Sequence, residues 1–324
     1  NAHGDIYETK YGLTTSQRVY GTVMENREGN GPCYLRTEGI SKEQEQDLYK
    51  AYLNMAPSQT LKWMEAGKGP SEENVEIEGT EPYIVGGHTA SGYWVDNNRA
   101  TTIEGLYAAG DVAGGCPQKY VTGALAEGEI AAEAILEYLN GKDDDRIAAE
   151  NKEEALERGG EQELSQTAIA KKAEYELHLN ASRSLMNAEQ LEEAMQKIMD
   201  QYAGGIGTDY RYSGMSLAKA DEKIAALLPA VDTLAAADTY ELMQIYELRE
   251  RLIVCQAVIA HLAARKETRW HSFGENTDYP QQSEEWMKYV NSRMENGEIK
   301  ILYRDLITKE NTGLNTAEKG AGER

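Results

Sequence analysis

The sequence is poor in basic residues: 33 Lys and Arg stand against 55 Asp and Glu, and the formal net charge is -22. A surface of that sign repels the phosphate backbone of nucleic acids, so we expect no nucleic-acid partner. Long apolar runs are also missing, and no apolar leader opens the chain. The sequence therefore predicts neither a transmembrane segment nor a signal peptide.

Cysteine is scarce as well. Cys33, Cys116 and Cys255 are far apart, odd in number, and lack the close spacing of zinc or iron–sulfur ligands. We therefore expect no metal site made by this chain alone. The same cysteine usage favours a reducing, cytoplasmic compartment, because structural disulfides belong to oxidising ones.

A third absence concerns nucleotide binding. The glycines of a G-x-G-x-x-G pattern let the backbone approach a dinucleotide pyrophosphate. No such pattern follows an N-terminal strand in this sequence. The first residue is Asn1 rather than methionine. If the chain binds a dinucleotide, the part of the site that contacts the pyrophosphate has to come from residues outside this sequence.

What is present is most informative at residues 101–111, TTIEGLYAAGD. The segment predicts a buried strand that stops at Gly110 and Asp111, then a small-residue loop and a helix from about residue 120 to 139. Glycine lets the backbone turn tightly or approach a ligand closely. Asp111 would lie at the carboxyl end of the strand, where open α/β sheets hold ligands, and the helix start offers unpaired N–H groups. The segment could form one side of a cofactor-binding site, and it could equally be an ordinary strand–loop–helix crossover without a ligand.

The segment is similar to the second flavin-contacting stretch of the fumarate reductase/succinate dehydrogenase flavoprotein superfamily, which reads T-x-x-x-G-L-[YF]-A-A-G-[DE]. The resemblance implies FAD as the cofactor, with Gly110 against it and Asp111 hydrogen-bonded to its ribityl chain. It also implies that the flavin ring is approached by backbone N–H groups of the small residues that open the following helix, Thr122, Gly123, Ala124 and Leu125.

A member of this superfamily also needs the missing G-x-G-x-x-G half. We therefore expect the chain to be the C-terminal part of a Rossmann-like FAD-binding flavoprotein, inactive as a fragment, of class α/β plus all-α. Residues 1–80 would be the end of the capping (substrate) domain, and residues 81–141 the second segment of the FAD-binding domain. Residues 142–324 would form a helical C-terminal domain, because that stretch is rich in Ala, Glu and Leu with a period near 3.6.

Local patterns predict the secondary structure in more detail. Ser41 and Gln44 form a capping-box signature, Pro229 interrupts a helical stretch, and residues 141–145 break another. The predicted helices lie at about 16–27, 41–54, 58–66, 145–179, 187–202, 215–228, 237–266 and 283–294. The predicted strands outside the flavin segment lie at about 33–36, 82–85 and 299–303.

Two residues are candidates for catalysis. His88 follows two glycines just before the flavin segment, where the superfamily places a substrate-contacting histidine able to donate a hydrogen bond or a proton. Arg18 precedes a stretch at residues 27–35, REGNGPCYL, that is similar to the end of the superfamily's capping domain, and the resemblance implies a substrate-binding arginine. A loop histidine bonded to a nearby carbonyl and a helix-surface arginine are the structural alternatives.

Two further residues are candidates for substrate binding. Lys119 stands where dicarboxylate enzymes of the superfamily carry an arginine, and lysine lacks the bidentate fork, which disfavours fumarate or succinate. The lysine and stretches such as EPYIVGGH at residues 81–88 resemble the adenylylsulfate reductase α-subunit branch instead. Trp94 could line the site, or it could pack beneath the glycine-rich turn.

The resemblance to that branch implies reduction of adenylylsulfate to sulfite and AMP, or the reverse. Electrons would come from a separate iron–sulfur β subunit, because this chain has too few cysteines to hold clusters. Two alternatives stay open: a fumarate reductase-like oxidoreductase with another small acceptor, and a non-catalytic scaffold derived from the family.

Overall fold

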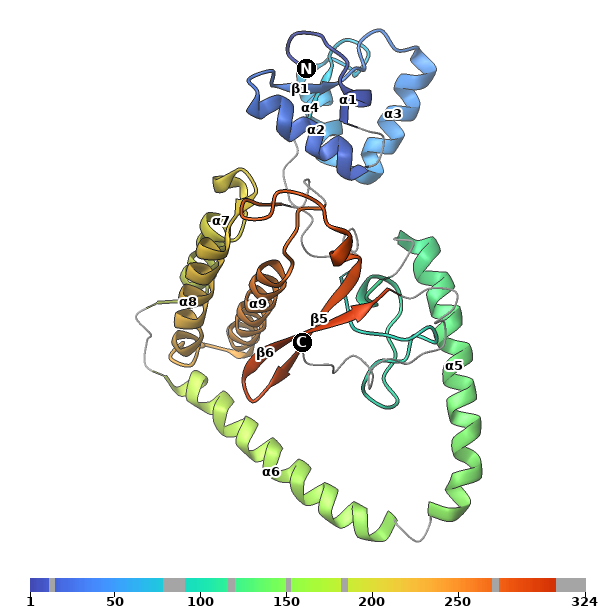
Figure 1. Cartoon of the computed structure of the whole chain (residues 1–324), viewed down its shortest axis with the longest axis vertical. Coiled ribbons are helices and arrows are strands. Elements are labelled where there is room, and N and C mark those ends of the chain that lie inside the picture. The colour runs from blue at the N-terminus through green and yellow to red at the C-terminus, as the bar shows by residue number, and fades with distance from the viewer. Residues whose placement is uncertain are drawn as a thin grey trace. The chain divides into compact units, whose positions relative to one another are not determined.

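The structure is a computed structural model of the chain, and it describes residues 1–11, 15–77, 91–115, 120–149, 153–181, 186–269 and 274–306. The chain divides into two compact units (Figure 1). The first contains Asn1–Glu81 and Trp270–Phe273, and the second contains Pro82–Arg269 and Gly274–Arg324. The strand predicted at 82–85 lies outside the described residues.

The first unit consists of short helices and one small sheet. In chain order these are α1 (Glu8–Tyr11), α2 (Thr15–Arg27), β1 (Cys33–Leu35), α3 (Lys42–Met55), α4 (Pro57–Ala66) and β2 (Val75–Ile77). β1 and β2 pair antiparallel. The predicted capping box is confirmed, because the side chains of Ser41 and Gln44 each accept the other residue's backbone N–H. Buried Trp63 of α4 packs edge-on against tyrosines of α3, which joins the two helices.

A buried carboxylate fixes the N-terminal part of this unit. The Glu25 residue is 2% exposed, and it accepts hydrogen bonds from the Asn1 side chain at 2.9 Å, the Lys10 ammonium at 2.8 Å and the Tyr11 hydroxyl at 2.9 Å. The bonds from Asn1 and Lys10 lower the pKa of Glu25 to about 2. The charge is therefore part of the folded unit at neutral pH.

The second unit is built on three helices, α7 (Ala188–Tyr202), α8 (Gly214–Val231) and α9 (Thr239–Ala264). They pack through apolar side chains at helical spacing that are fully buried, including Leu191, Leu217, Ile224, Leu248 and Leu252. The three helices were predicted, and the expected interruption near Pro229 begins slightly later, because α8 continues to Val231 before α9 starts at Thr239. Proline removes one hydrogen bond, and here only the last turn follows it. A short parallel pair, β3 (Arg211–Tyr212) and β4 (Glu275–Asn276), flanks this core.

Two strands near the C-terminus form a hairpin, β5 (Lys288–Glu295) and β6 (Glu298–Asp305), in antiparallel register (Figure 1). β6 contains the predicted strand at 299–303. The helix predicted at 283–294 was wrong, since helical structure there is limited to a 3-10 turn at Glu284–Trp286. Asn296 and Gly297 both have positive φ, at 52° and 81°. An Asn-Gly pair of this kind is the preferred two-residue hairpin turn, and it overrides the local helical preference.

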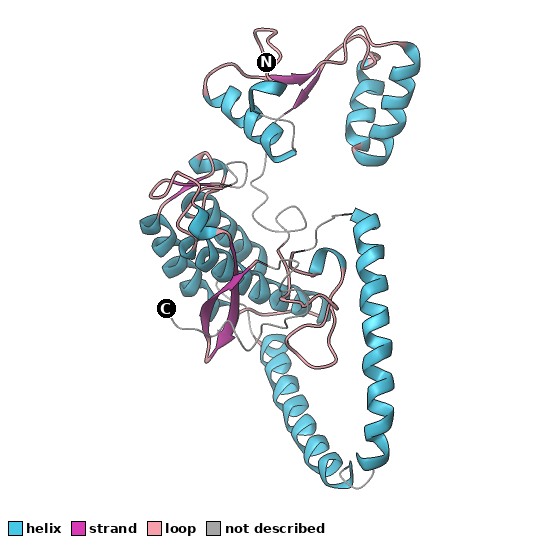
Figure 2. Cartoon of the chain, turned by 45° about the vertical axis from the view of Figure 1, so that its right-hand side comes forward, coloured by secondary structure: helices cyan, strands magenta, loops and turns pink. Residues whose placement is uncertain are grey.

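Two long helices join the flavin segment to the helical core, α5 (Tyr120–Ala149) and α6 (Glu153–Asn180). Figure 2 shows both as uninterrupted helices. The expected end of α5 near residue 139 was wrong, because the helix runs on through residues 141–145. One glycine costs a helix about 1 kcal/mol, which good helix formers on either side can offset. The predicted domain boundaries, after residues 80 and 141, stay predictions.

Candidate functional site

The glycine-rich segment 91–115 is held mainly by its own backbone. Tyr93 N–H donates to the Val112 carbonyl at 2.7 Å, and Gly114 N–H donates to the Tyr93 carbonyl at 2.8 Å. Gly92 and Gly114 lie at this crossing, and a Cβ at Gly92 would come within 2.5 Å of the Val112 carbonyl oxygen. No side chain fits there, so glycine is required by the approach of the two backbone strands.

The strand predicted at 105–109 is not formed in the described structure. Tyr107 makes one isolated bridge, to Ala100, and the flanking residues are extended without a ladder. Ala108 is buried with Val95 and Ala113 in a small cluster, whereas Leu106 is 46% exposed. A strand needs a neighbour to satisfy its backbone groups, and the described residues pair with 105–109 through a single bridge.

Gly110 and Asp111 form the turn that leads toward α5. Gly110 is buried with φ of 73°, and a Cβ on it would lie 3.2 Å from the Cβ of Ala124. Asp111, the next residue of this 3-10 turn, is exposed. Gly110 therefore lets the turn rest on the first turns of α5 while the Asp111 carboxylate faces solvent. The structure thus brings Gly110 against Ala124, and the predicted contact of these residues and of Asp111 with FAD stays a prediction.

A buried carboxylate that the sequence reasoning missed holds this turn from behind. Glu127 of α5 accepts the Gly110 N–H at 3.3 Å and pairs with the Arg99 guanidinium at 3.2 Å. Its side chain is 5% exposed. The signal was present in the sequence, because Gly123, Glu127 and Ala131 recur every fourth residue on the buried face of α5. Glu127 therefore joins α5, the turn at Gly110 and the chain at Arg99.

The other residues predicted to hold FAD lie in the first turns of α5. Gly123 is buried, whereas Thr122, Ala124 and Leu125 are exposed. Such a surface of small side chains at a helix start leaves backbone N–H groups accessible to a ligand. Their contact with FAD stays a prediction.

The candidates for substrate and catalysis are distributed over the chain. Arg18 is exposed on α2 of the first unit. His88 and Lys119 lie outside the described residues, so their roles stay predictions. Trp94 is partly buried, and its ring faces the Arg304 guanidinium at 4.4 Å from the ring centroid. That position is compatible with the packing alternative for Trp94, and its substrate role also stays a prediction.

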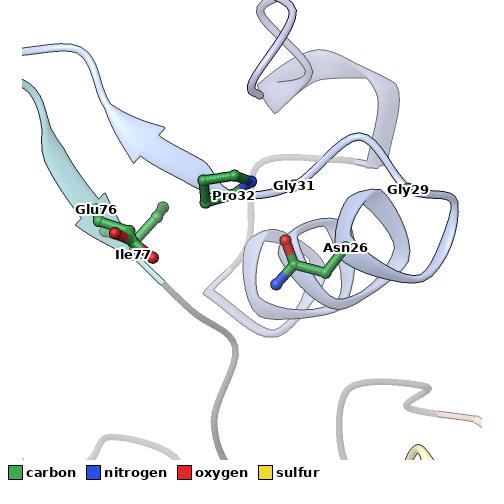
Figure 3. A pocket seen from close by; sticks show the side chains of 6 residues that line it. All are labelled: Asn26, Gly29, Gly31, Pro32, Glu76 and Ile77. Atoms are coloured by element: carbon green, nitrogen blue, oxygen red, sulfur yellow. The ribbon is translucent and has the colours of Figure 1, made fainter.

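A pocket of about 310 Å³ lies in the first unit, beside the motif similar to the capping domain (Figure 3). Figure 3 shows the side chains of Asn26, Pro32, Glu76 and Ile77 around it, with Gly29 and Gly31 completing the lining. None of the predicted site residues lines this pocket.

Among the described residues, no three His, Cys, Asp or Glu side chains converge as metal ligands do. None of the helices within these residues combines the length and apolar character needed to cross a bilayer.

Comparison with known proteins gives this geometry a context. Residues 192–318 match the family described as fumarate reductase flavoprotein C-term. The adenylylsulfate reductase subunit alpha of Megalodesulfovibrio gigas is 28% identical over 328 residues, covering 89% of this chain and 48% of the relative. The solved structure of adenylylsulfate reductase from Archaeoglobus fulgidus aligns with a TM-score of 0.75 at 27% identity, covering 95% of this chain and 55% of its own.

The resemblance predicted from the sequence is confirmed. The fold is that of the C-terminal part of a fumarate reductase-type flavoprotein, and the predicted class of α/β plus all-α is confirmed with it. A third relative, an uncharacterized FAD-dependent oxidoreductase of Methanocaldococcus jannaschii, is 24% identical over 84% of this chain and 44% of its own length. The chain thus spans about half the length of the relatives that it matches.

Proposed function

We propose that the chain forms the C-terminal part of an FAD-dependent oxidoreductase that reduces adenylylsulfate to sulfite and AMP, or catalyses the reverse reaction. The observation that carries the proposal is the Gly110–Asp111 turn, seated on Ala124 at the start of α5. Similarity to adenylylsulfate reductase over 89% of the chain supports the choice of substrate.

The residues present fit FAD. A Cβ at Gly110 would press on Ala124, so the turn and the helix start form a cradle without bulky side chains. Asp111 is exposed beside that cradle, where its carboxylate can accept hydrogen bonds from ribityl hydroxyls. Backbone N–H groups at Thr122 and Gly123 can donate to the polar edge of the flavin ring. When bound, FAD supplies two-electron transfer.

The substrate is anionic, whereas the chain carries a net charge of -22, so the site needs local cations. We assign these to Arg18 and Lys119, with His88 as a proton or hydrogen-bond donor. A guanidinium and an ammonium stabilise the negative charge that develops as the sulfur–oxygen bond to AMP breaks. Lysine suits this role without the bidentate carboxylate geometry that a dicarboxylate substrate favours.

Electrons would arrive from an iron–sulfur β subunit in the cytoplasm. Cys33 and Cys255 are free in the structure, and Cys33 is buried. Iron–sulfur clusters usually require four cysteine ligands, more than the three that this sequence contains. A partner subunit that carries the clusters is therefore part of the proposal.

The test uses the full-length protein, with its flavin reduced under anaerobic conditions and its absorbance followed after addition of adenylylsulfate. We expect prompt reoxidation with adenylylsulfate and none with fumarate. The variant His88→Ala should bind FAD normally but turn over at least tenfold more slowly, because general acid–base groups contribute about 10²–10⁴-fold. Unchanged turnover would remove His88 from the site.

The two alternatives correspond to distinct results of the same experiment. Reoxidation by fumarate but not by adenylylsulfate would replace the proposal with a fumarate reductase-like function. A full-length protein that holds no FAD would point to a scaffold derived from the family.

A further inference from the structure

Arg304 is a buried cation in an unusual setting. It lies on β6 directly opposite Tyr289 on β5. Its guanidinium is 4.4 Å from the ring centroid of Trp94 and 4.7 Å from that of Tyr289, and the residue is 9% exposed. The two rings therefore provide much of the environment of this charge.

Three partly buried arginines of the second unit have acidic partners. Arg265 and Arg269 both pair with Glu267, at 2.7 Å and 2.9 Å, and Arg99 pairs with Glu127. Across the described residues no carboxylate pairs with Arg304, and its Nε makes no hydrogen bond. Burial lowers the pKa of Arg304, as expected for a charge removed from water. Attraction to the faces of two aromatic rings offsets part of that cost.

Both rings are connected to the glycine-rich segment. Trp94 follows Tyr93, whose backbone pairs with Val112 and Gly114. The Tyr289 hydroxyl lies 3.7 Å from the position of a Cβ at Gly115. Figure 1 shows β5 and β6 beside this segment. The hairpin therefore approaches the glycine-rich segment at two places, Trp94 and Gly115.

We propose that Arg304 is a positioning residue: by holding Trp94 and Tyr289, it fastens residues 112–115 to the C-terminal hairpin and so fixes Asp111 for FAD. The inference rests on the proposed function, because FAD is the ligand of that turn. It gives the C-terminal hairpin a specific task in the flavin site. Because the Arg304 guanidinium faces Trp94 and Tyr289, its effect on FAD would pass through the turn that these residues contact.

The test measures FAD affinity and the visible circular dichroism of bound FAD in the full-length protein. The variants are Arg304→Met, Arg304→Lys, Trp94→Ala and the double variant Arg304→Met/Trp94→Ala. Arg293→Met is the matched control, because Arg293 lies on the same hairpin and is exposed. Wild-type FAD binding is measured first, and its absence would count against the proposed function rather than against Arg304.

We expect Arg304→Met to weaken FAD binding about tenfold, which corresponds to about 1.4 kcal/mol, and to change the dichroism, because the turn loses the cation–π contacts that hold it. Arg304→Lys should recover part of both. Both substitutions remove the same contact between Arg304 and Trp94. The double variant should therefore bind FAD as tightly as whichever single variant has the lower affinity. If wild type binds FAD and Arg304→Met matches Arg293→Met in affinity and dichroism, the positioning role is overturned. Additive losses in the double variant would equally refute the coupling to Trp94.

Discussion

Two regions of the molecule are stabilised in different ways: the helical core of α7, α8 and α9, and the glycine-rich segment 91–115. The core buries large apolar side chains such as Leu217, Ile224 and Leu252. The glycine-rich segment has a small buried cluster of Val95, Ala108 and Ala113, and it is held by backbone hydrogen bonds at glycines. Apolar area stabilises the first region, whereas close backbone approach determines the second.

This difference in packing indicates which of the two regions can accommodate a ligand. A packed core leaves no room for a ligand, whereas a glycine turn leaves backbone groups and one carboxylate exposed. Glu127 and Arg304 connect the turn to better-packed elements, α5 and the hairpin. The glycine-rich segment is thus held by its own backbone hydrogen bonds and by these two contacts to neighbouring elements, so substitutions in the two regions should affect different properties.

The largest loss of stability is expected for Leu252→Ala in the core. Leu252 is fully buried, and removing a buried leucine side chain costs about 3 kcal/mol of the free energy of unfolding. Urea denaturation of the full-length protein measures it. The control is Ile253→Ala, because Ile253 is 37% exposed and should lose much less. Equal losses would contradict the core assignment.

Glu127→Gln should have the next largest effect. The amide cannot pair with the Arg99 charge, and loss of a bond to a charged group costs about 2 kcal/mol. Because Glu127 also accepts the Gly110 N–H, FAD affinity should fall together with stability. Glu129→Gln, an exposed change on the same helix, serves as the control. A variant with normal FAD affinity would separate Glu127 from the flavin turn.

Gly110→Ala should cost about 1–2 kcal/mol, because an L-residue is strained at positive φ, and it should also displace the turn from Ala124. Gly128→Ala within α5 makes the opposite prediction. No atom lies within 4 Å of a Cβ there, so the change should stabilise the helix by about 0.5–1 kcal/mol. Thermal denaturation of both variants would show opposite shifts, and shifts of the same sign would contradict this account of the turn.

The last prediction concerns pH and the first unit. The bonds from Asn1 and Lys10 lower the pKa of Glu25 from 4.5 to about 2 in the folded state. A lowered pKa contributes stability that is present above pH 4.5 and is lost as the pH falls toward 2. In Glu25→Gln that part of the pH dependence should disappear, whereas Glu28→Gln at an exposed position should retain it. Identical acid-unfolding profiles of wild type and Glu25→Gln would remove Glu25 from this role.

The sequence predicted some elements well and others poorly, for physical reasons. The helices of the core followed from apolar periodicity, and α3 followed from the capping pair Ser41 and Gln44. The hairpin was missed because local helical propensity outweighed the Asn296–Gly297 turn signal. The strand predicted at 105–109 depended on neighbours that a local pattern cannot supply.

The candidate site was predictable in part. The motif at residues 101–111 indicated Gly110 and Asp111, and the structure brings both to the start of α5. The role of Glu127 depends on a contact across seventeen residues. The contact of Trp94 with Arg304 joins residues from distant parts of the chain, which the local pattern around neither residue indicates.

The most direct test of the central claim is the FAD content of the full-length Asp111→Ala variant beside that of Asp221→Ala, an exposed aspartate of α8. If the Gly110–Asp111 turn is the flavin floor, Asp111→Ala should lose most of its bound FAD on gel filtration while remaining folded, and Asp221→Ala should keep it. Full FAD occupancy in Asp111→Ala would contradict the assignment of this turn to the cofactor.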